Sequence, residues 1–198
     1  MCRLIESIRL ENGTFCRLSY HQQRMDNSVL MLTGKQNTIQ LAAELYEQLY
    51  PITGLYKCRI VYTAGGIVHK EFIPYTPLPP TALYVVRDNT ITYNHKFEDR
   101  RALEKYARPN NGTDVLIVSN GLVTDTAYCN VVFFDGSRWL TPAHPLLKGT
   151  MRQVLLEAGQ IHEEEVRGHH MRHFKAVKRI NALLQFDEKP LYTSQIIW

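Results

Sequence analysis

Hydrophobic and polar residues alternate with a period of two in several short runs, and this pattern is typical of half-buried β-strands. Where two runs are joined by a dipeptide that tolerates positive φ, the sequence predicts a hairpin. The predicted strand pairs are residues 5–10 with 14–19 about Asn12-Gly13 and residues 57–63 with 67–74 about Gly65-Gly66. Three further runs from residue 114 onward, joined by Asn120-Gly121 and Asp135-Gly136, predict a meander. Single strands are expected at 83–87 and 180–184, with a last extended run at 191–198.

Apolar residues recur at helical spacing in four other stretches. The predicted helices span residues 20–32, 38–49, 99–107 and 151–158. Thr38 is a plausible N-cap for the second helix, Pro51 stops it, and Gly159 ends the fourth. This mixture of hairpins and helices predicts an α+β fold.

A proline-rich segment divides the chain. Four of the seven residues from 74 to 80 are prolines, which disfavour both a helix and a strand ladder. We therefore expect an N-terminal α/β lobe over 1–74, a linker over 75–82, and a β-rich lobe over 83–198. The 198 residues suffice for two small lobes that share a cleft.

Composition narrows the class of protein. With 44% hydrophobic and 21% charged residues, the chain has the composition of a soluble globular protein. The net charge is +4, and the one basic concentration, at 167–179, follows three glutamates, so we interpret it as a solvated surface and expect no nucleic-acid partner. No apolar stretch is long enough for a membrane span, and the first residues do not resemble a secretory signal, so we expect a cytoplasmic protein.

Cysteine and histidine patterns indicate neither a disulfide framework nor a metal site. Cys2, Cys16, Cys58 and Cys129 form no C-x-x-C pair and are expected to be free thiols. The four histidines between 162 and 173 lack the spacing and the acidic or cysteine partners of a metal site, so no metal is expected.

The residues from 114 to 152 carry the strongest chemical signal. A central carboxylate, Asp125, precedes a helix that opens at Gly149-Thr150, and Lys96 lies ahead on a short segment of its own. A lysine amine, a buried carboxylate and a phosphate-binding helix start are what pyridoxal phosphate requires. Each feature also has an ordinary interpretation: an exposed lysine opening a helix, an acidic residue at a turn, and a plain loop-to-helix junction.

Two motifs in this region resemble a known family. V-T-D-T-A-Y-C-N-V-V-F-F resembles T-E-x-x-x-x-N-x-F, and W-L-T-P followed by L-K-G-T-M-R resembles T-P followed by G-I-(T/M)-R of the class IV aminotransferases. That family includes branched-chain and D-amino-acid aminotransferases and aminodeoxychorismate lyase. The likeness extends from residue 5 to about residue 184. It implies a D-amino-acid aminotransferase-like fold with pyridoxal 5′-phosphate in the cleft between two lobes.

The resemblance also implies roles for individual residues. Lys96 corresponds to the Schiff-base lysine of K-x-x-N, although Asp99 stands where the family has Asn. Asp125 corresponds to a glutamate beside the ring nitrogen, and Asn130 supports the site. The residues expected at the phosphate are Arg24 of H-x-x-R, Gly149, Thr150, Met151, Asn181 and Ala182.

These correspondences predict an aminotransferase acting on an amino acid and a 2-oxo acid. The resemblance also implies a homodimer, because the sites of the family lie near a subunit interface. Arg100 and Met151-Arg152 also suit an aminodeoxychorismate lyase that releases pyruvate; Arg100 would bind a substrate carboxylate, or pair with Asp99 or Glu104. Family members carry roughly thirty residues before the first strand that are absent here, so a non-catalytic cofactor- or partner-binding remnant is the alternative of another class. The sequence specifies neither the substrate, its stereochemistry nor the pathway.

Overall fold

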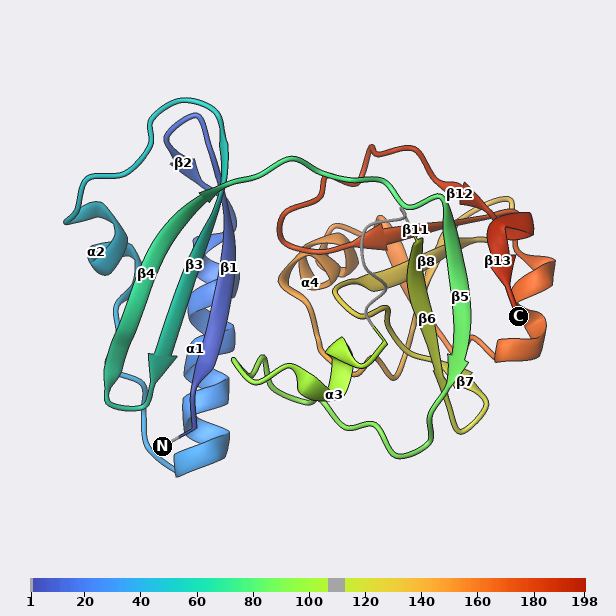
Figure 1. Ribbon diagram of the computed structural model, residues 1–198, viewed down its shortest axis with the longest axis horizontal. Helices are drawn as coiled ribbons and strands as arrows, with labels where there is room; N and C mark the ends of the chain where they lie inside the picture. The colour runs from blue at the N-terminus through green and yellow to red at the C-terminus, as the bar shows by residue number, and fades with distance from the viewer. Residues whose placement is uncertain (1, 107–112) are drawn as a thin grey trace. The chain divides into compact units, whose positions relative to one another are not determined.

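The computed structural model describes residues 2–106 and 113–198 and divides the chain into two compact units (Figure 1). The first unit comprises Met1–Pro77 together with His95–Asp99, and the second comprises Leu78–Asn94 and Arg100–Trp198. The short segment His95–Asp99 therefore packs with the first unit, whereas the sequence-based division assigned it to the second lobe.

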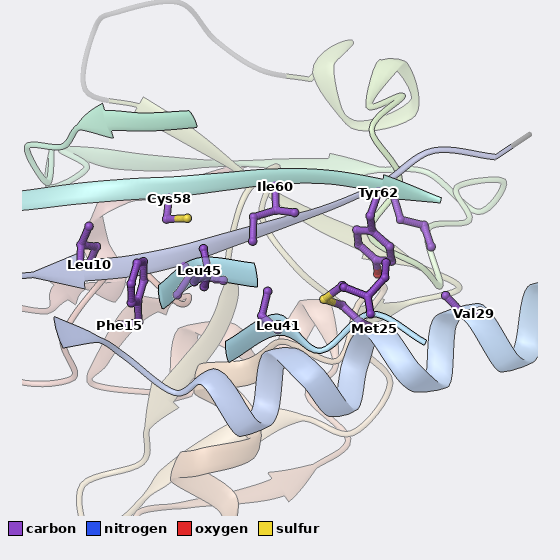
Figure 2. Packing of buried hydrophobic residues seen from close by; sticks show 12 residues of the cluster. Leu10, Phe15, Met25, Val29, Leu41, Leu45, Cys58, Ile60 and Tyr62 are labelled. Carbon is purple, nitrogen blue, oxygen red and sulfur yellow. The ribbon is translucent and has the colours of Figure 1, made fainter. Parts of the chain in front are cut away.

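The first unit is an antiparallel sheet with two helices. The strand order is β2-β1-β3-β4. Its elements are β1 (Leu4–Glu11), β2 (Thr14–Phe15), α1 (Leu18–Thr33), α2 (Leu41–Tyr46), β3 (Leu55–Thr63) and β4 (Gly66–Pro74). Buried apolar side chains from β1 and β3 pack against α1 and α2, as Figure 2 shows for Leu10, Ile60, Met25 and Leu45. This burial of apolar surface is the main stabilising contribution to the unit.

The turn residues explain where the first elements begin and end. Asn12 and Gly13 adopt positive φ angles of 47° and 79°, so the predicted hairpin is confirmed. Its second strand stops at Phe15 because Arg17 takes a left-handed conformation and α1 begins at Leu18; the prediction of strand up to residue 19 was wrong. The predicted first helix is confirmed, and it ends at Gly34 with φ 70°.

The second helix is shorter than predicted, and Thr38 does not cap it. Helix α2 covers Leu41–Tyr46, and its N-cap position is Gln40. The Gln22 side chain accepts a hydrogen bond from Leu41 N at 2.7 Å, so a residue of α1 satisfies the backbone that a cap would otherwise bind.

The segment His95–Asp99 lies antiparallel beside the N-terminal half of β1. Ile5 N donates to Lys96 O at 2.9 Å, Glu98 N donates to Arg3 O at 3.0 Å, and Leu4 forms an isolated bridge with Phe97. The edge of β1 that β2 leaves uncovered is thus paired with a segment distant in sequence.

Over its described residues, the second unit contains two sheets and two α-helices. The strand orders are β10-β9-β8-β11-β12 and β13-β5-β6-β7. Its elements are β5 (Ala82–Arg87), α3 (Arg101–Glu104), β6 (Thr113–Ser119), β7 (Leu122–Val123), β8 (Asn130–Phe134), β9 (Trp139–Pro142), α4 (Thr150–Glu157), β10 (Ile161–Glu164), η1 (Gly168–His173), β11 (Ala176–Ile180), β12 (Leu191–Tyr192), η2 (Thr193–Gln195) and β13 (Ile196–Ile197).

The five-stranded sheet is covered on both faces. One apolar cluster joins it to the four-stranded sheet through side chains such as Leu116, Phe133 and Val177. A second cluster packs Met151 and Leu155 of α4 against its other face. These two layers position the start of α4 next to the ends of β8 and β11.

The predicted meander is not one continuous sheet. The turn at Asn120-Gly121 is confirmed, with φ angles of 50° and 79°. However, β7 stays with β6 in one sheet, whereas β8 and β9 belong to the other. The chain changes sheets over residues 124–129, and this crossing segment contains Asp125.

Several boundaries in the second unit also differ from the prediction. Helix α3 covers only Arg101–Glu104, and Ala107 of the predicted helix lies outside the described residues. The strand predicted at 180–184 was wrong: β11 ends at Ile180, and a turn follows. The last run is divided into β12, η2 and β13, and β10 and η1 were not predicted.

The α+β class is confirmed by this arrangement. All four cysteines are free thiols, with Cys58 and Cys129 buried. Within residues 2–106 and 113–198, none of the helices has the length and apolar character needed to span a membrane.

Candidate functional site

The segment that crosses between the two sheets of the second unit holds a buried carboxylate. Asp125 is 4% exposed, and its backbone is fixed because Ile117 N donates to Asp125 O at 2.8 Å. Its side chain accepts hydrogen bonds from Asn130 Nδ2 to Oδ1 at 2.7 Å and from Leu147 N to Oδ2 at 3.0 Å. The carboxylate is therefore held in one orientation.

Burial dominates the ionisation of Asp125. Loss of solvent raises the pKa of this carboxyl from 3.8 to about 7, although the bonds from Leu147 and Asn130 and the charge of Arg152 oppose the shift. A buried carboxylate with a raised pKa is stabilised in its charged form by any cation placed beside it. This group is consequently suited to hold a protonated nitrogen of a bound molecule.

Asn130 connects Asp125 to the start of α4. Besides its bond to Asp125, Asn130 Nδ2 donates to Leu147 O at 2.7 Å, and Asn130 Oδ1 accepts from Gly149 N at 3.1 Å. A Cβ at position 149 would lie only 2.2 Å from Asn130 Oδ1. Gly149 is therefore required by contact with Asn130, a reason the sequence did not reveal; its φ of −73° is accessible to any residue.

The N-terminus of α4 has features suited to an anion. Gly149 is its N-cap and has no side chain that could cap the helix, and its own N–H donates to Asn130 Oδ1. Thr150 is 2% exposed, and its buried Oγ1 has no hydrogen-bond partner among the described residues. Buried hydroxyl groups are normally paired, so this one is available to a ligand at the helix start. The Met151 side chain belongs to the apolar core and can contribute only through its backbone.

Asn181 and Ala182 lie beside this cluster but follow β11 instead of ending a strand that begins at Ile180. Ile180 pairs with Asn130 in the β8–β11 ladder. The Asn181 side chain donates to Cys129 Sγ at 3.1 Å and accepts from the backbone N–H of Leu183 at 2.8 Å. Asn181 thus shapes the turn that contains Ala182.

Arg100 contacts the same crossing segment. Its Nη2 donates to Ala127 O at 2.7 Å, and its guanidinium lies 4.8 Å from the Tyr128 ring centroid and 5.7 Å from that of Tyr93. Cation–π contacts of this kind hold a guanidinium in a defined plane. Arg100 is therefore held next to residues 125–130 by contacts that the sequence-based pairing with Asp99 or Glu104 did not include.

The first unit contains a second cluster, formed by Glu6, His21 and Arg24. Glu6 is fully buried, and Arg24 binds it with two bonds, from Nε to Oε1 at 2.9 Å and from Nη2 to Oε2. His21 Nδ1 lies 2.6 Å from the same Oε2. Arg24 was predicted from the sequence, but Glu6 was missed.

The charges of this cluster account for its ionisation. Burial alone would raise the pKa of Glu6, but Arg24 and His21 outweigh it and lower this pKa to about 2. Burial lowers the pKa of His21, and the charges of Arg24 and Lys96 lower it further against the opposing effect of Glu6. The lowered pKa keeps the Glu6 carboxylate ionised beside Arg24, and because a carboxylate oxygen only accepts, the His21 imidazole donates to it from Nδ1.

Lys96 lies in this unit, on the segment beside β1. It is half-buried, and its carbonyl oxygen accepts the bond from Ile5 N. It does not open a helix, so the ordinary interpretation of this lysine fails. The predicted residues therefore fall into two groups: Arg24 and Lys96 in the first unit, and Arg100, Asp125, Asn130, Gly149, Thr150, Met151, Asn181 and Ala182 in the second.

Across residues 2–106 and 113–198, no group of three or more His, Cys, Asp or Glu side chains is arranged to hold a metal ion. The histidines of η1 pack edge to face, with 4.2 Å between the ring centroids of His169 and His170.

Comparison with known proteins agrees with this geometry. The family described as amino-transferase class IV matches residues 3–186. An uncharacterized protein of Haemophilus influenzae is 32% identical over 192 residues, covering 92% of this chain and 98% of that protein.

Two solved structures illustrate the shared fold. A protein from Haemophilus somnus 129pt, provisionally named 4-amino-4-deoxychorismate lyase, matches with a TM-score of 0.84 and 29% identity over 92% of this chain and 97% of that one. An aminotransferase from Brucella abortus, bound to the cofactor PLP, matches with a TM-score of 0.69 and 19% identity over 96% of this chain and 82% of that one.

Proposed function

Because the chain belongs to the class IV aminotransferase family, we propose that it is a pyridoxal-phosphate-dependent enzyme that transfers an amino group between an amino acid and a 2-oxo acid. The observation that carries the proposal is the buried carboxylate of Asp125, which Asn130 links to the start of α4. The solved Brucella abortus relative contains this cofactor on the same fold.

The residues of the second unit fit two parts of the cofactor. Asp125 would face the ring nitrogen, since a protonated nitrogen supplies the cation that a buried carboxylate needs. The backbone at Gly149 and Met151 and the unpartnered Thr150 hydroxyl would bind the phosphate. Asn130 and Asn181 would hold the surrounding backbone in place.

The residues of the first unit would supply the reacting amine and a phosphate contact. Pyridoxal phosphate supplies an aldehyde that condenses with amines and a ring that withdraws electrons from the substrate. Lys96 would provide the amine that holds the cofactor and, once displaced by substrate, would take the proton from the substrate Cα as a general base. Arg24 would donate hydrogen bonds to the phosphate.

An absorbance spectrum tests the proposal directly. The purified protein should gain the visible absorbance of lysine-bound pyridoxal phosphate when the cofactor is added, and Lys96→Ala should not. Lys35→Ala, which removes an exposed lysine of the same unit, should keep the band. A protein that takes up no cofactor would refute the proposal and favour a non-catalytic remnant of the fold.

A lyase is the second candidate, because a specific contact favours it. Arg100 is held beside the Asp125 segment by Ala127 and Tyr128, where its guanidinium can bind a substrate carboxylate. The Haemophilus somnus relative, at 29% identity, carries a lyase name. Pyruvate release from aminodeoxychorismate, measured beside amino-group transfer to 2-oxo acids, distinguishes the two reactions.

A further inference from the structure

The first sheet carries a carboxylate where its pattern calls for an apolar side chain. Along β1, Glu6 shares a face with Leu4, Ile8 and Leu10, and these three leucine and isoleucine side chains belong to the core that Figure 2 shows. Glu6 is fully buried. A buried charge is costly unless it is paired and hydrogen-bonded, so its partners must account for its presence.

Both partners of Glu6 come from α1. His21 and Arg24 are three residues apart and therefore lie on one side of the helix. Glu6 Oε1 accepts from Arg24 Nε at 2.9 Å, while Oε2 accepts from both Arg24 Nη2 and His21 Nδ1. The carboxylate is anchored by the imidazole on one side and engages the guanidinium on the other.

The two hydrogen bonds from Arg24 to Glu6 fix the orientation of its guanidinium group. A guanidinium bonded through Nε and Nη2 cannot rotate about its Cδ–Nε bond without breaking one of these bonds. Its plane and the direction of Nη1 are thereby fixed. An arginine on a helix otherwise has many rotamers, and the loss of this freedom on binding a ligand lowers affinity.

We propose that Glu6 and His21 are positioning residues that hold the Arg24 guanidinium in the orientation that binds the phosphate of the cofactor. This inference rests on the proposed function, in which Arg24 contacts that phosphate. Glu6 and His21 themselves touch neither the cofactor nor the substrate in this scheme.

The test compares two ligands that differ only in the phosphate, pyridoxal 5′-phosphate and pyridoxal. Glu6→Gln keeps the size of the side chain but removes its charge. In metal sites, partners that orient a ligand residue contribute about 10- to 100-fold to affinity, so we expect Glu6→Gln to weaken binding of pyridoxal phosphate at least about tenfold. Binding of pyridoxal should be unchanged, because it has no phosphate for Arg24 to hold.

A double-mutant cycle separates positioning from a direct contribution. If Glu6 acts through Arg24, Glu6→Gln should have no further effect on the affinity ratio of the two ligands once Arg24→Ala is present. Additive losses in the double variant would overturn the inference.

Stability needs its own control, since removing one partner of a buried ion pair is strongly destabilising. Asp114→Asn breaks a comparable pair in the second unit, where Arg179 Nη1 lies 2.7 Å from Asp114 Oδ2. It should lower the melting temperature without changing the affinity ratio. Should Glu6→Gln fail to fold, His21→Leu leaves the Glu6–Arg24 pair intact and should lower the ratio in the same direction.

The outcomes are distinguishable. A wild-type protein that binds neither ligand refutes the proposed function and this inference with it. A wild-type protein that prefers pyridoxal phosphate, together with an unchanged preference in Glu6→Gln, or in His21→Leu if Glu6→Gln does not fold, overturns the inference alone.

Discussion

Replacement of Gly149 by alanine tests how the second unit builds its carboxylate cluster. The backbone at Gly149 accepts alanine without strain, so the effect must come from the side chain. The added Cβ would lie 2.2 Å from Asn130 Oδ1, and ordinary contact begins at about 3.4 Å. Asn130 must therefore move by a distance that breaks its bond from Gly149 N.

The expected cost follows from the hydrogen bonds that move with Asn130. Its Nδ2 holds Asp125 Oδ1 and Leu147 O at 2.7 Å each. A buried polar group left without its partner costs about 1–3 kcal/mol, so loss of the Gly149 bond and one of these two bonds should cost roughly 2–6 kcal/mol. Alanine is also a poorer N-cap than glycine, which adds about 1 kcal/mol or less.

Urea unfolding of the cofactor-free protein measures this cost. In an Asn130→Ala background the clash is absent, and Gly149→Ala should then cost only the N-cap difference of about 1 kcal/mol or less. A coupling energy below about 1 kcal/mol between positions 149 and 130 would refute the steric explanation for the glycine.

Three further predictions concern pH, substrate binding and assembly. Because the folded-state pKa of Asp125 is about 7 and its unfolded value is 3.8, the folded protein retains a proton that the unfolded chain has lost; this group should lower the stability of the cofactor-free protein by about 4 kcal/mol as the pH rises from 4 to above 7. Urea unfolding of the wild type and of Asp125→Asn across this range measures the contribution as the difference between the two pH profiles, and parallel profiles would contradict it. Arg100→Ala should raise KM for a carboxylate substrate about tenfold, the equivalent of one charge-assisted hydrogen bond, with cofactor absorbance retained; an unchanged KM excludes Arg100 from substrate binding. Exposed Tyr192, Ile197 and Trp198 favour a homodimer, which sedimentation at micromolar protein should detect and a monomer would contradict.

Local turn chemistry was readable from the sequence. Asn12-Gly13 and Asn120-Gly121 adopt the positive φ angles that their residue types favour, so both turns were placed correctly. The order and spacing of the family motifs also identified the candidate residues of the second unit from Asp125 to Met151. The structure adds the hydrogen bonds by which Asn130 links Asp125 to Gly149.

Features that depend on distant partners were not readable. Glu6 is a charged residue on the apolar face of an alternating strand, and only its contacts with His21 and Arg24 explain why it is buried there. The sequence predicted a strand at 180–184, whereas β11 covers Ala176–Ile180, because Lys178 and Arg179 make the sequence of β11 polar. In the structure Lys178 Nζ lies 4.9 Å from the Trp139 ring centroid, which lets a charged residue occupy an internal strand.

The pairing of His95–Asp99 with β1 has a consequence for how the protein can be divided. The backbone passes from one unit to the other after residues 77, 94 and 99. Cleavage of a single peptide bond therefore cannot separate the two units intact. A fragment ending at residue 77 would lack the segment that carries Lys96 and would expose the hydrogen-bonding edge of β1 near Ile5. Such bare edges promote association with other chains. A fragment designed to contain the first unit alone should therefore include the five residues His95–Asp99 as well as residues 1–77.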